Sequence, residues 1–583
     1  MRNYPFQFQI PILTEVKGRK AVIAFLAVVL ISLWFRAGYP AFGVWGTVDD
    51  ALFVRTAQSI ASGRWLGKYD FLVLAKGAFF PFFIAINKLT GLPLKIAEHL
   101  LYLAASIFAA LALSRLTGQR WLLLVGFLVL AFFPIPWGGT NARVVREPLY
   151  QVLSLALFFL AARFFMEGEP GHGRRFGKTF GVVAGCYWLT REEGIWLLPA
   201  LAVLALPAVP PILASVRECQ HARLKEVMRW AITPLVAFLS VVMLVNSINW
   251  VKYKVFRNND FRSGPFAQAY GALARIKHDQ WKRYVVFPRD ARERAYSVSP
   301  AARELAGYFE GDSGQGWIKS SQGYPKPWGC VGEPQACNDE ILSGWFVWAL
   351  RNAVAAAGHY QSATDADAYY KRLAEEINAA CDNNTIPCRE RRDSLAPVWR
   401  GHYLRDTLLA STEVLMTLVD LGPEPVGVPA SDLTPEQARI FQTTINGWLN
   451  GLADDGTKAV PGAPSHLDDI RIFLTRKISA LYAGASPYLA VFALASYFFL
   501  LFAWVKVKSA RISRNSIVML TALAVAVASR VGMLGFFEAT SFPSNNLLYL
   551  LPVVPLYLLS IVAGTGLGVV ALVNIMRGER TAS

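Results

Sequence analysis

Hydrophobic residues are concentrated in long runs in the first 250 and the last hundred or so positions of this 583-residue chain. A helix needs roughly 20 apolar residues to cross a bilayer, and ten runs approach or exceed that length, although the third and fifth are short. The pattern predicts an α-helical polytopic membrane protein with about ten to eleven transmembrane helices. The expected crossings are 21–35, 96–113, 121–137, 148–165, 179–190, 195–213, 230–250, 478–507, 516–537 and 547–576.

The polar region between the seventh and eighth runs predicts a separate soluble part. Residues 252–476 contain charges, Gly and Pro throughout and no apolar run of spanning length. Helical periodicity at 365–380 and 435–449 favours a mainly helical domain. The expected division is therefore a membrane module at 1–251 with a first outer loop at 37–94, an outer soluble domain at 252–476, and further transmembrane helices at 477–583.

Basic residues gather in alternate connections between the runs. The positive-inside rule places these connections and both termini in the cytoplasm, and places 252–476 outside an inner membrane, in the periplasm. The net charge of +17 is explained by these loops and requires no nucleic-acid partner. The basic residues are Lys17, Arg19, Lys20, Arg115, Arg120, Arg174, Arg175, Lys178, Arg217, Arg223, Lys225, Arg229, Lys506, Lys508, Arg511, Arg514, Arg577 and Arg580.

Four of the six cysteines form two close pairs in the predicted outer domain. Cys330 precedes Cys337, and Cys381 precedes Cys388. Paired cysteines are typical of an oxidising compartment, so we expect disulfides, with the connectivity left open. A zinc site is the alternative, but the spacing is wider than a C-x2-C knuckle and no His lies close to either pair.

The first predicted outer loop holds two adjacent carboxylates, Asp49 and Asp50, directly before an amphipathic stretch at 53–63. Lys76 follows, ahead of an aromatic-rich piece at 79–83. Aromatic rings are favoured at headgroup level, so both pieces are predicted to be helices that lie in the membrane interface.

The order of these features resembles the GT-C superfamily of membrane glycosyltransferases, in particular the lipid A aminoarabinose transferase and protein O-mannosyltransferase group. The carriers of the resemblance are the Asp49-Asp50 loop, Lys76 before an aromatic helix, and Glu147 in Arg146-Glu147-Pro148-Leu149. Leu189-Thr190-Arg191-Glu192-Glu193-Gly194 resembles the family's Thr-Arg-x-Glu-Gly turn, and Tyr549-Leu550-Leu551-Pro552 its final Tyr-x-x-Pro. Gly77-Ala78 replaces the Pro-Pro that follows the lysine in relatives.

The resemblance implies transfer of a sugar from a polyprenyl-phosphate donor to a glycan, lipid or protein acceptor at the outer face of the membrane. Asp49 matches the catalytic aspartate and would act as general base in an inverting displacement. Asp50 would support it, and Lys76 would meet the donor phosphate. No cofactor is expected to be required; a divalent metal at Asp49, Asp50 and Glu147 is the alternative.

Arginines near these motifs are candidates for holding the phosphate, because a guanidinium pairs with phosphate oxygens through two hydrogen bonds. Several of these residues also have an alternative, purely structural role. Glu147 can be a helix-terminal acid, the 191–193 cluster can be a polar turn, and Lys76 and Arg55 can be headgroup anchors. The candidates are Arg55, Arg143, Arg146, Arg191 and Arg530, with Glu192, Glu193 and Tyr549 as further site residues.

Two other functions remain open. A transporter or flippase for a lipid-linked sugar would suit the buried charge at Arg530, although the chain has no internal repeats of the kind many transporters show. A lipid-linked glycan polymerase or ligase would use the same donor with other catalytic residues. Phosphate loops, zinc-protease motifs and serine-esterase motifs are absent from the sequence, which excludes those chemistries.

Overall fold

The computed structural model describes residues 19–45, 48–167, 173–217, 221–279, 284–322, 340–452, 466–507 and 512–582. Across these residues the structure is helical, with only isolated β-bridges beside the helices. Six helices are long and apolar enough to cross a membrane, which confirms the predicted class of polytopic helical membrane protein. They are Leu94–Thr117 (α5), Glu147–Met166 (α7), Lys225–Tyr253 within α11, Asp468–Lys506 within α21, Arg514–Thr540 (α22) and Val554–Arg577 within α24.

The other predicted crossings correspond to shorter or broken helices, so the number of ten to eleven stays a prediction. The expected crossing at 121–137 ends at Ala131, ahead of Pro134, and the expected crossing at 547–576 is interrupted around Pro552. Proline has no backbone N–H to donate and ends or kinks a helix. The shorter helices are α2 (Arg19–Ala37), α6 (Trp121–Ala131), α8 (Gly173–Trp188), α9 (Leu198–Ala205), α10 (Val209–Arg217) and α23 (Leu547–Leu550).

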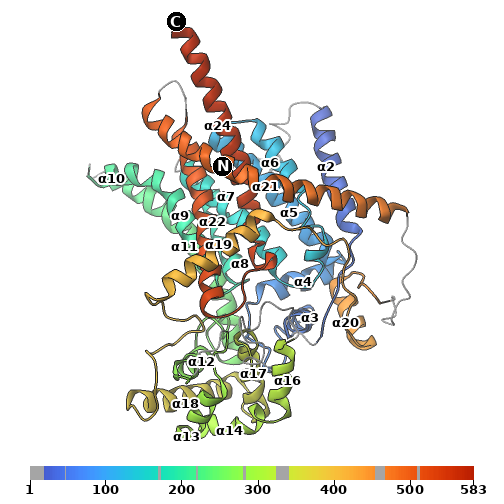
Figure 1. The fold of residues 1–583 in the computed structure, drawn as a ribbon, viewed down its shortest axis with the longest axis vertical. Coiled ribbons are helices and arrows are strands. Elements are labelled where there is room, and N and C mark those ends of the chain that lie inside the picture. The colour runs from blue at the N-terminus through green and yellow to red at the C-terminus, as the bar shows by residue number, and fades with distance from the viewer. Residues whose placement is uncertain are drawn as a thin grey trace, which may run out of the picture.

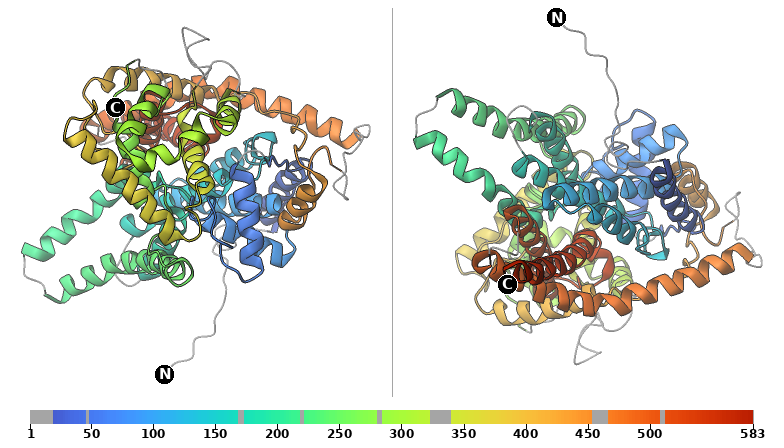
Figure 2. Two further views of the ribbon diagram at one scale, coloured as in Figure 1. Left: turned by 90° about the horizontal axis from the view of Figure 1, so that it is seen from below. Right: turned by 90° about the horizontal axis from the view of Figure 1, so that it is seen from above.

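The long helices form a bundle, and a group of short helices lies at one end of it (Figure 1). Within the bundle, α7 packs on both α5 and α8, α8 packs on α11, and α21 packs on α24. Seen along the perpendicular direction, α10 and α11 project to one side and α21 extends to the other (Figure 2).

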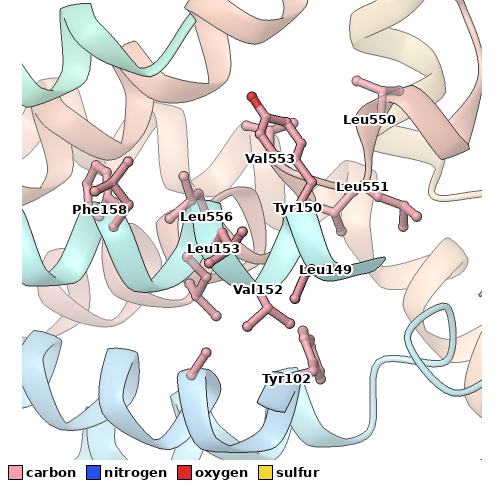
Figure 3. Close-up of a cluster of buried hydrophobic side chains, with 14 of the residues drawn as sticks. Tyr102, Leu149, Tyr150, Val152, Leu153, Phe158, Leu550, Leu551, Val553 and Leu556 are labelled. Atoms are coloured by element: carbon pink, nitrogen blue, oxygen red, sulfur yellow. The ribbon is translucent and has the colours of Figure 1, made fainter. Parts of the chain in front are cut away.

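The first turns of α7 are enclosed by apolar side chains from two other parts of the chain (Figure 3). Leu149, Tyr150 and Leu153 lie in the same buried cluster as Tyr102 of α5 and Leu551, which follows α23. Pro148 stands in the first turn of α7, where its missing N–H costs nothing. This packing fixes Glu147, the first residue of α7, at the end of the bundle.

Helices α3 (Val48–Ala61) and α4 (Phe79–Thr90) lie between the bundle and the group of short helices (Figure 1). They correspond to the two predicted interfacial elements and pack on each other, with Phe53 and Phe80 edge to face at 5.0 Å. Asp49 and Asp50 occupy the first turn of α3, where carboxylates stabilise a helix through its dipole.

The short helices between Pro265 and Asp382 form a unit with its own apolar core, here called the α12–α18 subdomain. Its buried Arg351 binds Asp260 at 2.7 Å and donates to the carbonyls of Phe71 and Val73, which ties the subdomain to the loop after α3. The helices are α12 (Pro265–Arg275), α13 (Arg289–Val298), α14 (Pro300–Glu304), α15 (Ala306–Phe309), α16 (Asp312–Gln322), α17 (Ser343–Ala356) and α18 (Ala363–Asp382).

A disulfide joins Cys381 to Cys388 and confirms one of the two predicted pairs. Cys330 and Cys337 lie outside the described residues. The sequence left the connectivity of the four cysteines open, and the observed bridge closes the end of α18 onto the segment that follows it.

The later part of the predicted outer domain packs against the bundle. Helix α19 (Tyr403–Asp420) lies on α22, and α20 (Pro435–Ile445) packs on α3 and α4. Isolated parallel bridges join Val44 to Asp432 and Ala41 to Leu449. Residues 421–452 therefore fasten the segment that leads into α3.

Candidate active site

The carboxylate of Asp49 is paired with Lys76. Their Oδ1 and Nζ atoms lie 2.5 Å apart, and Nζ also lies over the rings of Phe53 and Trp348, at 5.6 and 5.5 Å from their centroids. Burial raises the pKa of Asp49, but the Lys76 ammonium, with Arg143 and Arg146 behind it, brings that pKa below its ordinary value. Asp49 is thus held as a carboxylate.

Asp50 lies deeper and has different partners. Its side chain is fully buried, accepts hydrogen bonds from Arg143 Nε at 2.9 and 3.1 Å, and accepts one from the backbone N–H of Val44 at 3.2 Å. Burial raises its pKa to about 6 against the opposing effect of Arg143. Two adjacent carboxyl groups therefore have pKa values displaced in opposite directions.

Glu147 and Arg191 form a second buried pair, between the start of α7 and the loop after α8. Arg191 Nη1 lies 2.5 Å from Glu147 Oε1, and its Nε lies 2.6 Å from Glu193 Oε1. The Arg191 guanidinium is also close to the rings of Tyr150 and Tyr549, at 5.7 and 5.4 Å.

Arg146 extends this network toward Lys76. It makes two hydrogen bonds with the Glu192 carboxylate, at 3.0 and 2.8 Å, and one with the carbonyl of Thr190. Burial raises the pKa of Glu192, but Arg146, with a smaller contribution from Lys76, lowers it to about 2. Glu192 stays ionised at any physiological pH.

Arg530 of α22 is fully buried and completes the network. It donates to the carbonyl of Tyr549 at 2.6 and 3.1 Å, lies 3.8 Å from Glu193, and stands over the ring of Trp196 at 5.5 Å. Its Nη1 atom has no hydrogen-bond acceptor within the described part of the chain. A charge placed inside a spanning helix is costly and usually serves a function.

The network is close to electrically neutral. Five cations, namely Lys76, Arg143, Arg146, Arg191 and Arg530, face five carboxylates, namely Asp49, Asp50, Glu147, Glu192 and Glu193. Charges removed from water are tolerated when they are paired and hydrogen-bonded. All ten had been singled out from the sequence, and the structure pairs each of them with an oppositely charged member of the set.

Arg55, the remaining phosphate candidate, lies apart from this network. It binds Asp70 at 3.0 Å on the exposed side of α3 and lines a cleft of about 420 Å³ between α3, the loop at 66–73 and the subdomain. The cleft begins next to the site, because Leu52 on α3 follows Asp49 by one turn. The other lining residues are Thr56, Ser59, Leu66, Gly67, Lys68, Tyr69, Phe71, Leu72, Val73, Ala355, Tyr360 and Gln361.

The sequence did not identify Arg262 or assign Trp348. Arg262 stacks on Trp188 at 3.7 Å and donates to the carbonyls of Trp188 and Arg191, so it supports the loop that carries Arg191. It lies just after a spanning helix with no motif around it. Trp348 stands on α17 and approaches Lys76 from the subdomain. Only the tertiary fold brings either residue to the site.

Gly77 permits the two halves of the site to meet. A Cβ at this position would lie 1.9 Å from the carbonyl oxygen of Leu189, and the same oxygen accepts a hydrogen bond from the N–H of Phe79. The loop with Lys76 thus touches the backbone two residues before Arg191. In the sequence, Gly77 is a departure from the Pro-Pro of relatives. In the structure, only a glycine fits at this position, because a Cβ would collide with the carbonyl oxygen of Leu189.

Within the described residues, no three His, Cys, Asp or Glu side chains are grouped in a way that could hold a metal ion. Asp49, Asp50 and Glu147 each have a basic side chain as partner. Whether the protein requires a metal stays a prediction.

Among solved structures, the chain is similar to ArnT from Cupriavidus metallidurans in the apo state, with 13% sequence identity over 91% of this chain and 77% of that one, at a TM-score of 0.28. At that TM-score we base no argument on the similarity. No protein-family model matches the chain, and no curated protein matches it.

Replacement of Gly77 by alanine is expected to disturb the site without removing any charge. The added methyl has to push the Lys76 loop away from Leu189, and overpacking of this kind costs about 1–3 kcal/mol. Thermal unfolding of the purified protein should show a lower Tm for Gly77→Ala. Gly344→Ala is the matched control, because a Cβ there has no neighbour within 4 Å; an equal Tm for the two variants would contradict the assignment.

Proposed function

We propose that this protein is a membrane glycosyltransferase that moves a sugar from a polyprenyl-phosphate donor to an acceptor hydroxyl at the outer face of an inner membrane. The observation that carries the proposal is the Asp49–Lys76 pair, a base beside a cation, at the edge of a buried group of arginines. Acceptor deprotonation and phosphate departure need these two kinds of group side by side. The GT-C resemblance of the motifs assigns the same residues.

In the proposed step, the Asp49 carboxylate takes the proton of the acceptor hydroxyl. The acceptor oxygen forms a bond to the anomeric carbon from the face opposite the phosphate. The bond between the anomeric carbon and the phosphate oxygen breaks, and its electron pair leaves with the phosphate. The products are the glycoside with inverted configuration and polyprenyl phosphate.

Lys76 has a different task before and after the donor binds. In the free protein it lowers the pKa of Asp49, which makes that carboxylate a weak base. A donor phosphate that draws the Lys76 ammonium toward itself removes this effect and strengthens the base as the substrates meet. One donor atom without a hydrogen-bond acceptor within the described chain, Arg530 Nη1, is suited to a further phosphate oxygen.

The near-neutral network is also compatible with the transfer of negative charge from Asp49 to the phosphate during the reaction. As Asp49 takes up a proton it loses one negative charge, and the departing phosphate gains one. The total charge within the site therefore stays constant, which avoids the large cost of a net charge in a poorly hydrated place.

We place the acceptor in the cleft beside α3. It is lined by hydroxyl-bearing side chains, by Tyr69 and Tyr360, whose rings stack at 5.5 Å, and by Gln361 of the subdomain. Stacked rings next to hydrogen-bonding groups are suited to a sugar ring. Thr56 follows Asp49 by seven residues, so the cleft extends about 10 Å along α3 from the base.

Asp49→Asn is expected to lower transfer of labelled sugar from polyprenyl-phosphate donors by about 10²–10⁴-fold in reconstituted membranes, because the amide cannot take the proton. Asp393→Asn, at an exposed carboxylate in a weak pair, serves as the control and should transfer normally. Donor movement across the bilayer without transfer, equal in both variants, would instead support a lipid-sugar transporter.

The transfer rate is expected to fall as the pH drops through about 6. Asp50 takes up a proton there, because its pKa is raised to about 6, and its pairing with Arg143 weakens before Asp49 is protonated. Rates of transfer measured between pH 5 and 8 should show this loss in the native protein. Asp50→Asn should be slower at pH 8 and nearly flat across the range; an unchanged pH profile in that variant would refute the role given to Asp50.

Ser59→Phe is expected to raise the acceptor KM by at least about tenfold and to leave the donor KM unchanged, because the ring fills the cleft. Initial rates at varied donor and acceptor concentrations separate the two effects. Ser62→Phe, one turn away at an exposed position outside the cleft, is the matched control. A rise in the donor KM alone would assign the cleft to the donor.

A further inference from the structure

Helix α19 belongs to the part of the sequence predicted to be soluble, yet it packs along α22, a candidate membrane span. Its buried face consists of Thr407, Ala410, Val414 and Leu418. The contact is close, because a Cβ on Gly535 of α22 would lie 2.8 Å from the backbone of Ser411. Close approach through small residues is typical of helix pairs in membranes.

The exposed surface of α19 has a leucine side and an acidic side, and Arg405, Leu409 and Met416 are exposed between them. Leu404, Leu408 and Leu415 are separated by four and seven residues, so they share one face, and they are 52%, 58% and 39% exposed. Asp406, Glu413 and Asp420 follow one another at intervals of seven and share another face. One side of α19 therefore packs on α22, a second side exposes leucines, and a third side exposes carboxylates.

Aromatic residues mark the start of α19 and its level along the bundle. Trp399 and Tyr403 lie 5.6 and 6.4 Å from the ring of Phe536, which stands about 6 Å before the end of α22 at Thr540. Trp and Tyr are favoured where a bilayer meets water. The start of α19 therefore lies at the same level as the end of a spanning helix.

Water is an unfavourable neighbour for the apolar side. The exposed parts of these leucines are more stable against apolar surroundings than in water. Helix α19 also contacts α21, a second candidate span, on which Leu481 and Tyr488 are exposed.

From these contacts we propose that α19 is seated in the membrane. Its Leu404–Leu408–Leu415 side lies against the acyl chains of the leaflet in which α22 ends, and its Asp406–Glu413–Asp420 side faces water. The inference does not depend on the proposed reaction. It divides the predicted outer domain into a subdomain off the membrane and a later segment that is anchored in it.

The test labels the full-length native protein in phospholipid nanodiscs that contain a phospholipid with a photoactivatable diazirine in its acyl chain. Peptide mass spectrometry should locate adducts on Leu404, Leu408 or Leu415 and none on α18, which serves as the internal control. Hydroxyl-radical oxidation should mark the acidic side of α19 and spare Leu404, Leu408 and Leu415. Oxidation of the leucines without lipid adducts, or protection of them from both reagents, would overturn the proposal.

A pair of variants repeats the test by another route. In nanodiscs, Leu408→Asn should reduce the lipid adducts on α19 and lower the Tm, because it places an amide among acyl chains. Glu413→Asn, on the acidic side of the same helix, should change neither. Equal effects of the two substitutions, or none from Leu408→Asn, would show that lipid does not cover the leucine side.

Discussion

The site depends on the need to pair charges that have been taken out of water. Asp50, Glu147, Arg191 and Arg530 lie almost completely buried, and each is stable there only because a group of opposite charge or a carbonyl lies within reach. Since the partners come from α3, α7, α22 and the loop after α8, the pairs determine how these elements are spaced. The ion pairs that allow these charges to be buried therefore also set the geometry of the candidate active site.

Within this network the two adjacent aspartates differ through their surroundings and not through their chemistry. Asp49 faces Lys76 at the edge of the network, whereas Asp50 points inward to Arg143 and to the backbone of Val44. Successive residues in a helix are turned by about 100°, so neighbours in sequence point in different directions. Asp49 therefore stays at the edge of the network beside Lys76, and Asp50 holds the chain that precedes α3.

The class of fold could be predicted from the sequence, because long apolar runs are a local signal. The charged residues were singled out mainly by the resemblance of their motifs; the structure pairs them with one another, and their roles stay predictions. The helix breaks at Pro134 and Pro552 could also have been predicted, because proline ends or kinks a helix. The hydrophobic runs continue past both prolines, and so the predicted crossings were drawn through them. The positions of Trp348, Arg262 and α19 could not be predicted, since each depends on contacts between distant segments. The long stretch from 252 to 476 looked uniform in composition, yet its two parts pack on different neighbours.

The bridges that fasten the segment before α3 have a consequence for how the protein is made. Val44 pairs with Asp432, and Ala41 with Leu449, although hundreds of residues separate them. A ribosome adds roughly 5–20 residues each second, so the N-terminal partners wait on the order of 20–80 s for the others. The half-made chain therefore lacks these bridges, and the segment before α3 can be fastened only after residues 432–449 have been added.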